Sequence, residues 1–283
     1  MPSTDDILQP HEWHPDSAID YRSETRWSAL CASIKEDIME LLFDRGRTHR
    51  SSKVSELQKV AEQQWSALPE HFRIVDGKSD RMRTPFDRDF LISLRLNHLH
   101  VKFLLRRLLL DRLPQPDGPL IEIAQQILAL VVEAILTRDE PANSGTTLSW
   151  KVAYYGLPAT GMILLAMTAQ PMIPCLKTAR AKVLRDLAVL AAEVEQGTIV
   201  KPEDPNYAVL AQAAQTIRRF LDLIHNEDQR IRTSREVSLS NNAEDDYMWA
   251  ASLGSEIWDS EISFWPSLAE HPSPFAQYSV APH

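Results

Sequence analysis

The chain has 283 residues, of which 44% are hydrophobic and 24% charged, a mixture typical of globular proteins and long enough for one large domain or two modest ones. Its 30 basic and 39 acidic residues give a formal net charge of −9, which repels phosphate backbones and argues against direct nucleic-acid binding by this chain. Only 8 residues are glycine, against roughly 20 at an average usage of about 7%, so phosphate-binding glycine loops and turn-rich β folds are disfavoured. The two cysteines, Cys31 and Cys175, are too few for a disulfide scaffold or a cysteine-based zinc site.

Residues 1–20 form a polar leader without a basic segment or an apolar core, so we expect no secretory signal and an intracellular protein. The sequence HEWH at 11–14 separates two histidines by three positions, a spacing compatible with metal ligation on one helical turn. No third ligand is nearby, so we expect both histidines to face solvent and predict no metal site.

Apolar residues at helical spacing predict most of the elements that follow. One helix is expected at about 21–44 and a second at about 51–68, where a proline ends it. Thr84 can cap a third helix, with Pro85 in the first turn and Asp87 near the positive end of the helix dipole.

The third helix is long and continues to about residue 112. Its histidines, His98 and His100, are two positions apart and therefore point to different sides of a helix. We expect one to pack at an interface and the other to be exposed, with no metal between them. The pair Arg106-Arg107 could hold an anionic ligand, although such pairs more commonly lie along a helix with their charged ends in water.

Further helices are expected from Pro119 to about 135, at 176–196, and from Asp204 to about 224. An uncharged run at 152–176 adds a central helix, which makes about seven in all, and no segment alternates as a strand would. The predicted fold class is therefore all-α, with one helical domain at 21–235.

The uncharged run follows Lys151 and begins VAYYGLPATG. It is long enough to cross a bilayer, but its tyrosines, its central Pro158 and the lack of a basic flank argue against a membrane span. It has no preceding strand and no Lys-Ser/Thr pair, so it is not a phosphate loop. We expect a helix buried on all sides, interrupted or restarted at Pro158, with Gly156 allowing neighbouring helices to approach closely.

Residues 236–283 form a distinct tail with 8 acidic residues, 7 aromatic residues and no lysine or arginine. Acidic residues that keep aromatic side chains exposed are typical of activation domains, which bind coactivator grooves. Alternatively, the aromatic residues fold back onto the helical body as its last layer. The candidate coactivator contacts are Trp249, Trp258, Phe264 and Trp265.

Several segments resemble the C-terminal half of the regulatory region of fungal zinc-cluster transcription factors, often called the middle homology domain. The resemblance covers most of residues 20–272. The segments, in order, are WSALPEHFR (65–73), LRLNHLHVKFLLRRLLLDR (94–112), LIEIAQQILALVVEAILTRD (120–139), YYGLPATG (154–161), DPNYAVLAQAAQTIRRFLDLI (204–224) and FWPSLAEHP (264–272).

This resemblance implies an all-helical regulatory domain that resides in the nucleus, forms homodimers and controls transcription through coregulators. The zinc-cluster DNA reader of the family needs six closely spaced cysteines, and this chain has two. The resemblance therefore does not imply that this chain binds DNA. We expect either a fragment of a longer factor or a regulator that acts through partner proteins.

A small apolar effector, if one binds, is expected to contact Tyr154, Tyr155, Met162 and Met167, although methionines more commonly fill gaps in a core. No nucleophile elbow and no H-E-x-x-H sequence is present, so we predict no catalytic, metal or cofactor-binding residues. The alternative function is a helical enzyme of a biosynthetic pathway acting on an apolar metabolite. Such an enzyme needs titratable groups converging in one cavity, for example a tyrosine at 154 or 155 beside an aspartate, glutamate or histidine.

Overall fold

A computed structural model describes residues 13–43, 50–73, 84–109, 117–137, 147–168 and 173–236, with side chains up to residue 226. Within these ranges the chain is helical and contains no strand, which confirms the predicted all-α class. The elements are α1 (Tyr21–Phe43), α2 (Arg50–Ala67), α3 (Glu70–Arg73), α4 (Pro85–Leu109), α5 (Gly118–Leu136), α6 (Leu148–Lys151), the π-helical turn η3 (Val152–Gly156), α7 (Leu157–Thr168), α8 (Pro174–Glu195) and α9 (Tyr207–Glu236).

The chain divides into two compact units, Met1–Leu221 and Asp222–His283. All of the elements from α1 to α8 and the first half of α9 belong to the first unit. The histidine at 11 and the four candidate coactivator contacts lie outside the described residues. The second histidine of HEWH, His14, is exposed as predicted.

Side-chain caps explain where the two central helices begin. At the start of α4, the Asp87 backbone N–H donates to the Thr84 hydroxyl and the Thr84 backbone N–H donates to the Asp87 carboxylate, both at 3.1 Å. This reciprocal cap satisfies two of the unpaired groups at a helix start, and it confirms the predicted boundary. Asp117 caps α5 by accepting from the Leu120 backbone N–H at 3.0 Å. The Arg106 side chain also donates to Asp117, which joins the end of α4 to the start of α5.

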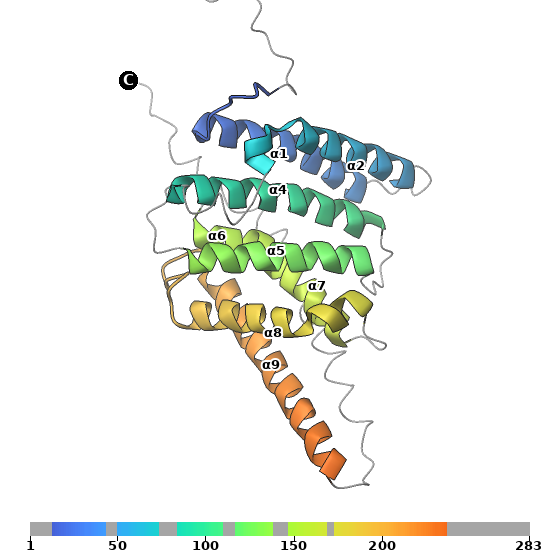
Figure 1. The fold of residues 1–283 in the computed structure, drawn as a ribbon, viewed down its shortest axis with the longest axis vertical. Coiled ribbons are helices and arrows are strands. Elements are labelled where there is room, and N and C mark those ends of the chain that lie inside the picture. Colours follow the sequence, from blue (N-terminus) through green and yellow to red (C-terminus); the bar gives the residue numbers. More distant parts are fainter. Residues whose placement is uncertain are drawn as a thin grey trace, which may run out of the picture. The chain divides into compact units, whose positions relative to one another are not determined.

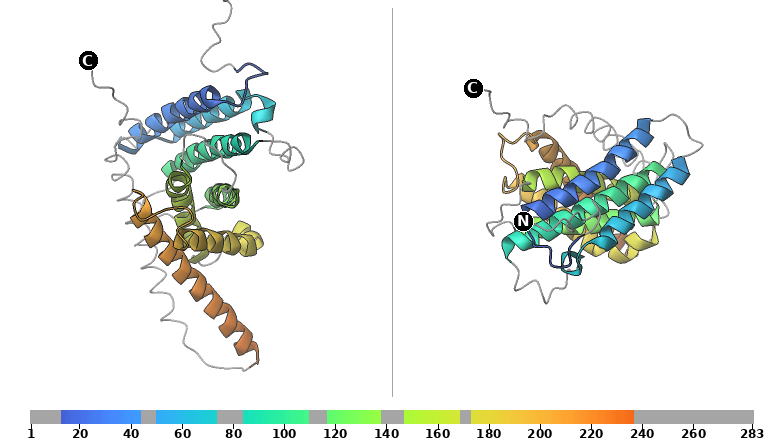
Figure 2. Two further views of the ribbon diagram at one scale, coloured as in Figure 1. Left: turned by 90° about the vertical axis from the view of Figure 1, so that its left-hand side faces the viewer. Right: turned by 90° about the horizontal axis from the view of Figure 1, so that it is seen from above.

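The helices of the first unit are stacked in layers (Figures 1 and 2). α4 packs against α1 and α2 on one side and against α5 on the other. α5 in turn packs against η3, α7 and α8. Because α4 and α5 each have neighbours on opposite sides, apolar residues recur on more than one of their faces. The largest fully buried apolar side chains in the described part of the chain include Trp27, Phe72, Phe90, Phe103 and Phe220.

One helix in the described residues, α5, is long and apolar enough to cross a membrane by length and composition alone. Its apolar residues Leu120, Ile121, Ile127 and Ile135 are fully buried. The contacts of α5 with α4, α7 and α8 explain this burial, because a helix with helical neighbours on several sides needs an apolar surface all round. α5 therefore has the character of a core helix.

Candidate functional site

Residues 148–168 form one helical rod made of α6, η3 and α7. In the middle of the rod the Leu157 backbone N–H donates to the Val152 carbonyl, a bond across five residues that widens the turn. The widened turn ends immediately before Pro158, whose ring would crowd the preceding turn of a regular α-helix and which has no N–H to donate. The break in α-helical geometry thus precedes Pro158 and takes the form of a π turn, so the rod continues through the proline.

At Gly156 the rod lies close to Val131 of α5. A Cβ atom added at Gly156 would lie 3.3 Å from the Val131 Cγ1 atom, closer than side-chain carbons usually pack. The expected close approach at Gly156 is therefore confirmed. Neighbouring residues Val152, Ala153 and Ala159 are buried, so the rod is enclosed at this level.

Replacing Gly156 by valine is expected to lower the free energy of unfolding by about 2 kcal/mol, because the new methyl groups overpack against Val131. Gly156→Ala should leave the free energy of unfolding nearly unchanged. The higher helix propensity of alanine contributes about 1 kcal/mol, which offsets the close contact of its Cβ atom with Val131. Urea denaturation measures both effects. In a Gly156→Val background, Val131→Ala should cost less than it does alone, and strictly additive effects would show that the two residues do not touch.

The π turn brings two adjacent tyrosines against one histidine. The His100 ring lies 4.6 Å from the Tyr154 ring and 5.2 Å from the Tyr155 ring, both edge to face. Trp150 stacks on Tyr154 at 4.4 Å. Edge-to-face and offset packing of this kind is favourable for aromatic rings. The cluster therefore fixes the rod against α4 at the level of Tyr154 and Tyr155.

Lys35 of α1 contacts the same cluster. Its ammonium donates to the Asn97 Oδ1 atom at 2.6 Å and lies 5.2 Å from the Tyr154 ring centre and 5.7 Å from the Tyr155 ring centre. Burial lowers the pKa of Lys35 to about 8, and the nearby Cys31 thiol acts in the opposite direction. The aromatic rings and the amide oxygen stabilise a charge that has lost part of its hydration.

Lys151, the single charge at the start of the uncharged run, points into the protein. Its side chain is 2% exposed, and its ammonium donates to the Asp89 carboxylate at 2.6 Å. The Asp89 side chain is 21% exposed, so the pair joins the rod to the first turns of α4 near the protein surface. A buried charge needs such a partner, because burying it alone would cost several kcal/mol.

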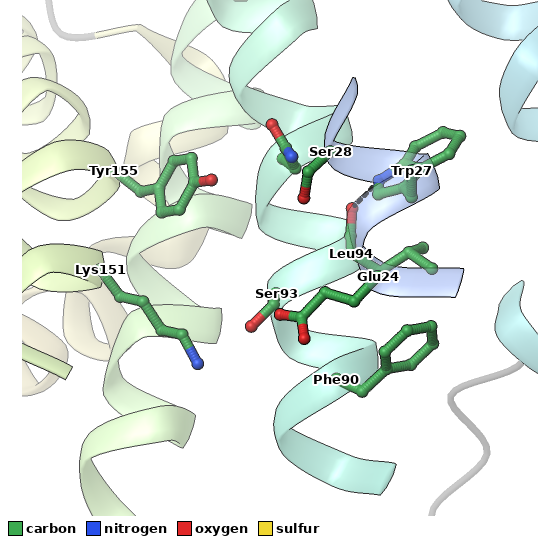
Figure 3. A pocket seen from close by; sticks show the side chains of 9 residues that line it. Glu24, Trp27, Ser28, Phe90, Ser93, Leu94, Lys151 and Tyr155 are labelled. Atoms are coloured by element: carbon green, nitrogen blue, oxygen red, sulfur yellow. Dashed lines mark hydrogen bonds between the residues drawn. The ribbon is translucent and has the colours of Figure 1, made fainter. Parts of the chain in front are cut away.

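A small pocket opens between α1, α4 and the rod (Figure 3). Its volume is about 30 Å³, and exposed Ser28 lies at its rim. In Figure 3, Lys151 and Tyr155 extend from the rod toward α1 and α4, and Glu24 extends from α1 toward α4. The lining residues are Glu24, Trp27, Ser28, Phe90, Ser93, Leu94, Asn97, Lys151 and Tyr155.

The surroundings of the pocket raise the pKa values of two acidic groups in its lining, Glu24 and Tyr155. Burial raises the pKa of Glu24, while the Lys151 charge lowers it and the Asp89 charge raises it further. Burial also raises the pKa of the Tyr155 phenol well above its ordinary value, with smaller contributions from Tyr154 and Glu24. Tyr155 is therefore a hydrogen-bond donor in this pocket at neutral pH.

The expectation that one of His98 and His100 is exposed is wrong, since their exposed fractions are 5% and 0%. α4 lies between two layers, so both of the sides to which these histidines point are covered. His98 stacks on Trp65 at 4.3 Å, whereas His100 meets the tyrosines of η3. Burial lowers the pKa of His98 to about 4 and places that of His100 well below its ordinary value.

The stability of the protein should therefore fall as the pH is lowered from 6.5 toward 4. In this window the unfolded chain binds a proton at His98 that the folded chain does not bind. The free energy of unfolding therefore falls by at most about 1.4 kcal/mol for each pH unit. His100 acts in the same direction. Urea denaturation between pH 7 and 5.5 measures the slope, which should become smaller in His98→Phe. A slope that His98→Phe leaves unchanged would contradict this assignment.

The structure brings together some of the residues that the sequence singles out. Tyr154 and Tyr155 contact the same cluster, and Tyr155 lines the pocket. Met162 and Met167 are buried in the core, and neither lines this pocket. In the pair Arg106-Arg107, for which an anion site was the less common interpretation, Arg106 forms an ion pair with Asp117.

The sequence analysis did not identify the polar residues that line the pocket with Tyr155. Ser93 and Asn97 are four positions apart in α4, a spacing that places both on one helical face. Lys151 borders an uncharged run, and such a charge can face inward only if the fold supplies a partner. The position of Glu24 on α1 carries no comparable signal, because isolated acids on amphipathic helices usually face solvent.

Among the described residues, no group of three or more histidine, cysteine, aspartate or glutamate side chains is placed to hold a metal ion. Comparison with family models, with characterised proteins and with solved structures gives no match to this chain.

Proposed function

We propose that this chain is a helical regulatory domain of the kind found in fungal zinc-cluster transcription factors. In this role it resides in the nucleus and acts through protein–protein contacts, with coregulators as partners and a second copy of the chain as its dimer partner. In this role, DNA would be bound by another polypeptide or by another domain. The proposal rests on the resemblance of six ordered segments and on the way in which three of them pack.

The observation that carries the proposal is the packing of the segments 94–112, 120–139 and 154–161. Their residues 94–109, 120–136 and 154–161 lie in α4, in α5, and in η3 with α7, and these elements form the centre of the first unit. α4 packs on α5, and α5 packs on both η3 and α7. Three of the six segments on which the resemblance depends thus lie in the core of the domain, which supports the proposal.

Exposed apolar side chains supply candidate contact surfaces for a partner protein. Large apolar residues rarely stay exposed in clusters without a partner, although single ones are common. Those exposed in the described part of the chain are Tyr21, Met39, Leu42, Leu109, Leu136 and Tyr207. We expect the purified chain to sediment as a dimer, and a monomer at all concentrations tested would contradict the dimer part of the proposal.

A tethering experiment tests the regulatory role. The full chain is fused to an unrelated DNA-binding domain and expressed in fungal nuclei with one reporter that detects activation and one that detects repression. We expect transcription of one reporter to change relative to the unfused DNA-binding domain. Trp27→Ala, which should destabilise the helical core, serves as a control that loses the effect. A folded nuclear fusion that changes neither reporter would overturn the proposal.

One observation favours the alternative function, an enzyme that acts on an apolar metabolite. Glu24, Lys151 and Tyr155 line the same pocket, which is the convergence of titratable groups that such an enzyme requires. The volume of about 30 Å³ argues against it, because ligand pockets are usually about ten times larger. Incubation of the protein with polyketide, terpenoid and fatty-acyl metabolites tests whether it is an enzyme. Turnover that is lost in Tyr155→Phe without loss of stability would establish the enzyme, and we expect none.

A further inference from the structure

The amine of Lys35 on α1 lacks a carboxylate partner within the described residues. Its ammonium donates to the Asn97 Oδ1 atom at 2.6 Å, and no ion pair between described residues includes it. Lys151, in contrast, is held by the Asp89 carboxylate. Charges removed from water usually have a partner of opposite charge, because desolvation alone is costly. A lysine without such a partner is a candidate for chemistry in its uncharged form.

The titratable groups that face this amine are neutral at pH 7 and supply no opposite charge. They are Cys31 one turn earlier on α1, His100 on α4, and Tyr154 and Tyr155 on η3. Burial raises the pKa of the Cys31 thiol and of the Tyr154 phenol to about 12, and that of Tyr155 well above its ordinary value. Burial places the pKa of His100 well below its ordinary value. The surroundings therefore favour the uncharged amine, and burial lowers the pKa of Lys35 to about 8.

An uncharged lysine amine is a nucleophile toward carbonyl compounds. Its nitrogen lone pair attacks the carbonyl carbon of an aldehyde, a C=N bond replaces the C=O bond, and the oxygen leaves as water without any oxidant or reductant. Uptake of one proton gives a positively charged Schiff base. The rings of Tyr154 and Tyr155, centred 5.2 and 5.7 Å from the nitrogen, are placed to stabilise that charge. Acylation would instead give an uncharged amide, for which the rings offer no such stabilisation.

The space around the amine suits a small aldehyde. Lys35 is partly exposed, so small molecules in solution can reach it. Asn97 and Tyr155, which contact the amine, also line the pocket of about 30 Å³ between α1, α4 and the rod. This volume corresponds to roughly two water-sized positions, enough for the short alkyl chain of a small aldehyde. Trp27 and Leu94 also line the pocket and give it apolar walls.

We propose that Lys35 is a covalent binding site for a small aliphatic aldehyde, held as a protonated Schiff base between Asn97 and the rings of Tyr154 and Tyr155. The nitrogen of this adduct keeps one N–H group, which can donate to the Asn97 Oδ1 atom as the ammonium does. The site goes beyond the proposed regulatory role and does not depend on it.

Reductive trapping tests the proposal. The full chain is incubated at pH 7 with acetaldehyde and sodium cyanoborohydride, which reduces the Schiff base to a stable N-ethyl amine, and mass spectrometry of its peptides locates the label. We expect Lys35 to be labelled at least about tenfold faster than the exposed Lys53 and Lys177. An amine with a pKa of about 8 has a neutral fraction at pH 7 about 200 times that of an ordinary lysine, and restricted access offsets part of this advantage. Labelling of Lys35 no faster than that of Lys53 and Lys177 would overturn the proposal.

Asn97→Asp tests the cause of the reactivity. This isosteric change places a carboxylate next to the ammonium, which stabilises the charged form, so labelling of Lys35 at pH 7 should fall at least about tenfold. Ser33→Asp adds the same charge at an exposed position of α1 and should leave the rate unchanged. Urea denaturation confirms that both variants fold. A folded Asn97→Asp that is labelled at the wild-type rate would contradict the proposal.

The wild-type protein provides a further test that needs no variant. In guanidinium chloride the unfolded chain should lose the preference for Lys35 over Lys53 and Lys177, because the surroundings that favour the uncharged amine are gone. A preference that persists in the unfolded chain would arise from the local sequence and would overturn the assignment to the folded site.

Discussion

Replacing Lys151 by methionine is expected to lower the free energy of unfolding by about 3 kcal/mol, one of the largest single effects in this protein. The substitution keeps most of the buried side-chain volume but leaves the Asp89 carboxylate without the ammonium that lies 2.6 Å away. This expected loss of stability is at the low end of the range for removing one partner of a buried ion pair, because Asp89 is 21% exposed and retains some water. Urea denaturation at pH 7 measures the loss.

The double variant Lys151→Met with Asp89→Asn separates the loss of the pair from the loss of packing. Once the unpaired carboxylate is removed, most of the stability should return, because replacing both partners of a buried pair is far less costly than removing one. A double variant as unstable as Lys151→Met alone would show that the lysine stabilises the protein by packing. A single variant with wild-type stability would show that the ion pair contributes nothing measurable.

Replacing Trp27 by alanine is expected to cost about 3 to 5 kcal/mol, the usual range for removing a buried aromatic side chain. Trp27 is 2% exposed, packs against Trp65 with ring centres 5.8 Å apart, and donates its indole N–H to the Leu94 carbonyl at 3.0 Å. It therefore connects α1 to both α2 and α4. Thermal and urea denaturation both measure the loss.

Trp27→Phe is the matched control for this prediction. It preserves much of the ring packing and removes the hydrogen bond to Leu94, so it should cost about 1 to 2 kcal/mol. The order of stability should be wild type, then Trp27→Phe, then Trp27→Ala. If Trp27→Ala were as stable as Trp27→Phe, α1 would not be held to α4 by this residue.

The helices could be predicted from the sequence because their signals are local. The cap formed by Thr84 and Asp87 involves residues three positions apart, and the buried stripe of α1 follows from spacing alone. The π turn was not predictable from the spacing of apolar residues. Its hydrogen bond spans five residues instead of the four of an α-helix, a difference too small to change that spacing. The sequence indicated a disturbance at Pro158 without indicating its form.

The polar residues of the site could not be predicted because their partners are distant in the chain. Lys151 and Asp89 are separated by 62 positions, and so are Lys35 and Asn97. Each of these residues, taken alone, resembles an ordinary surface residue of an amphipathic helix. The burial of His100 has the same origin, because it depends on layers covering both sides of α4 and not on the local sequence of that helix.

The enclosure of residues 148–168 is the feature on which both the fold and the regulatory proposal depend. Amide hydrogen exchange of this segment, followed by mass spectrometry in native buffer, tests it most directly. We expect amides in α7 to be among the slowest in the protein and to exchange only through global unfolding, as buried core helices do. Rapid exchange in α7, comparable to that of the exposed start of α2, would show that the segment is accessible to solvent and would contradict the enclosed position.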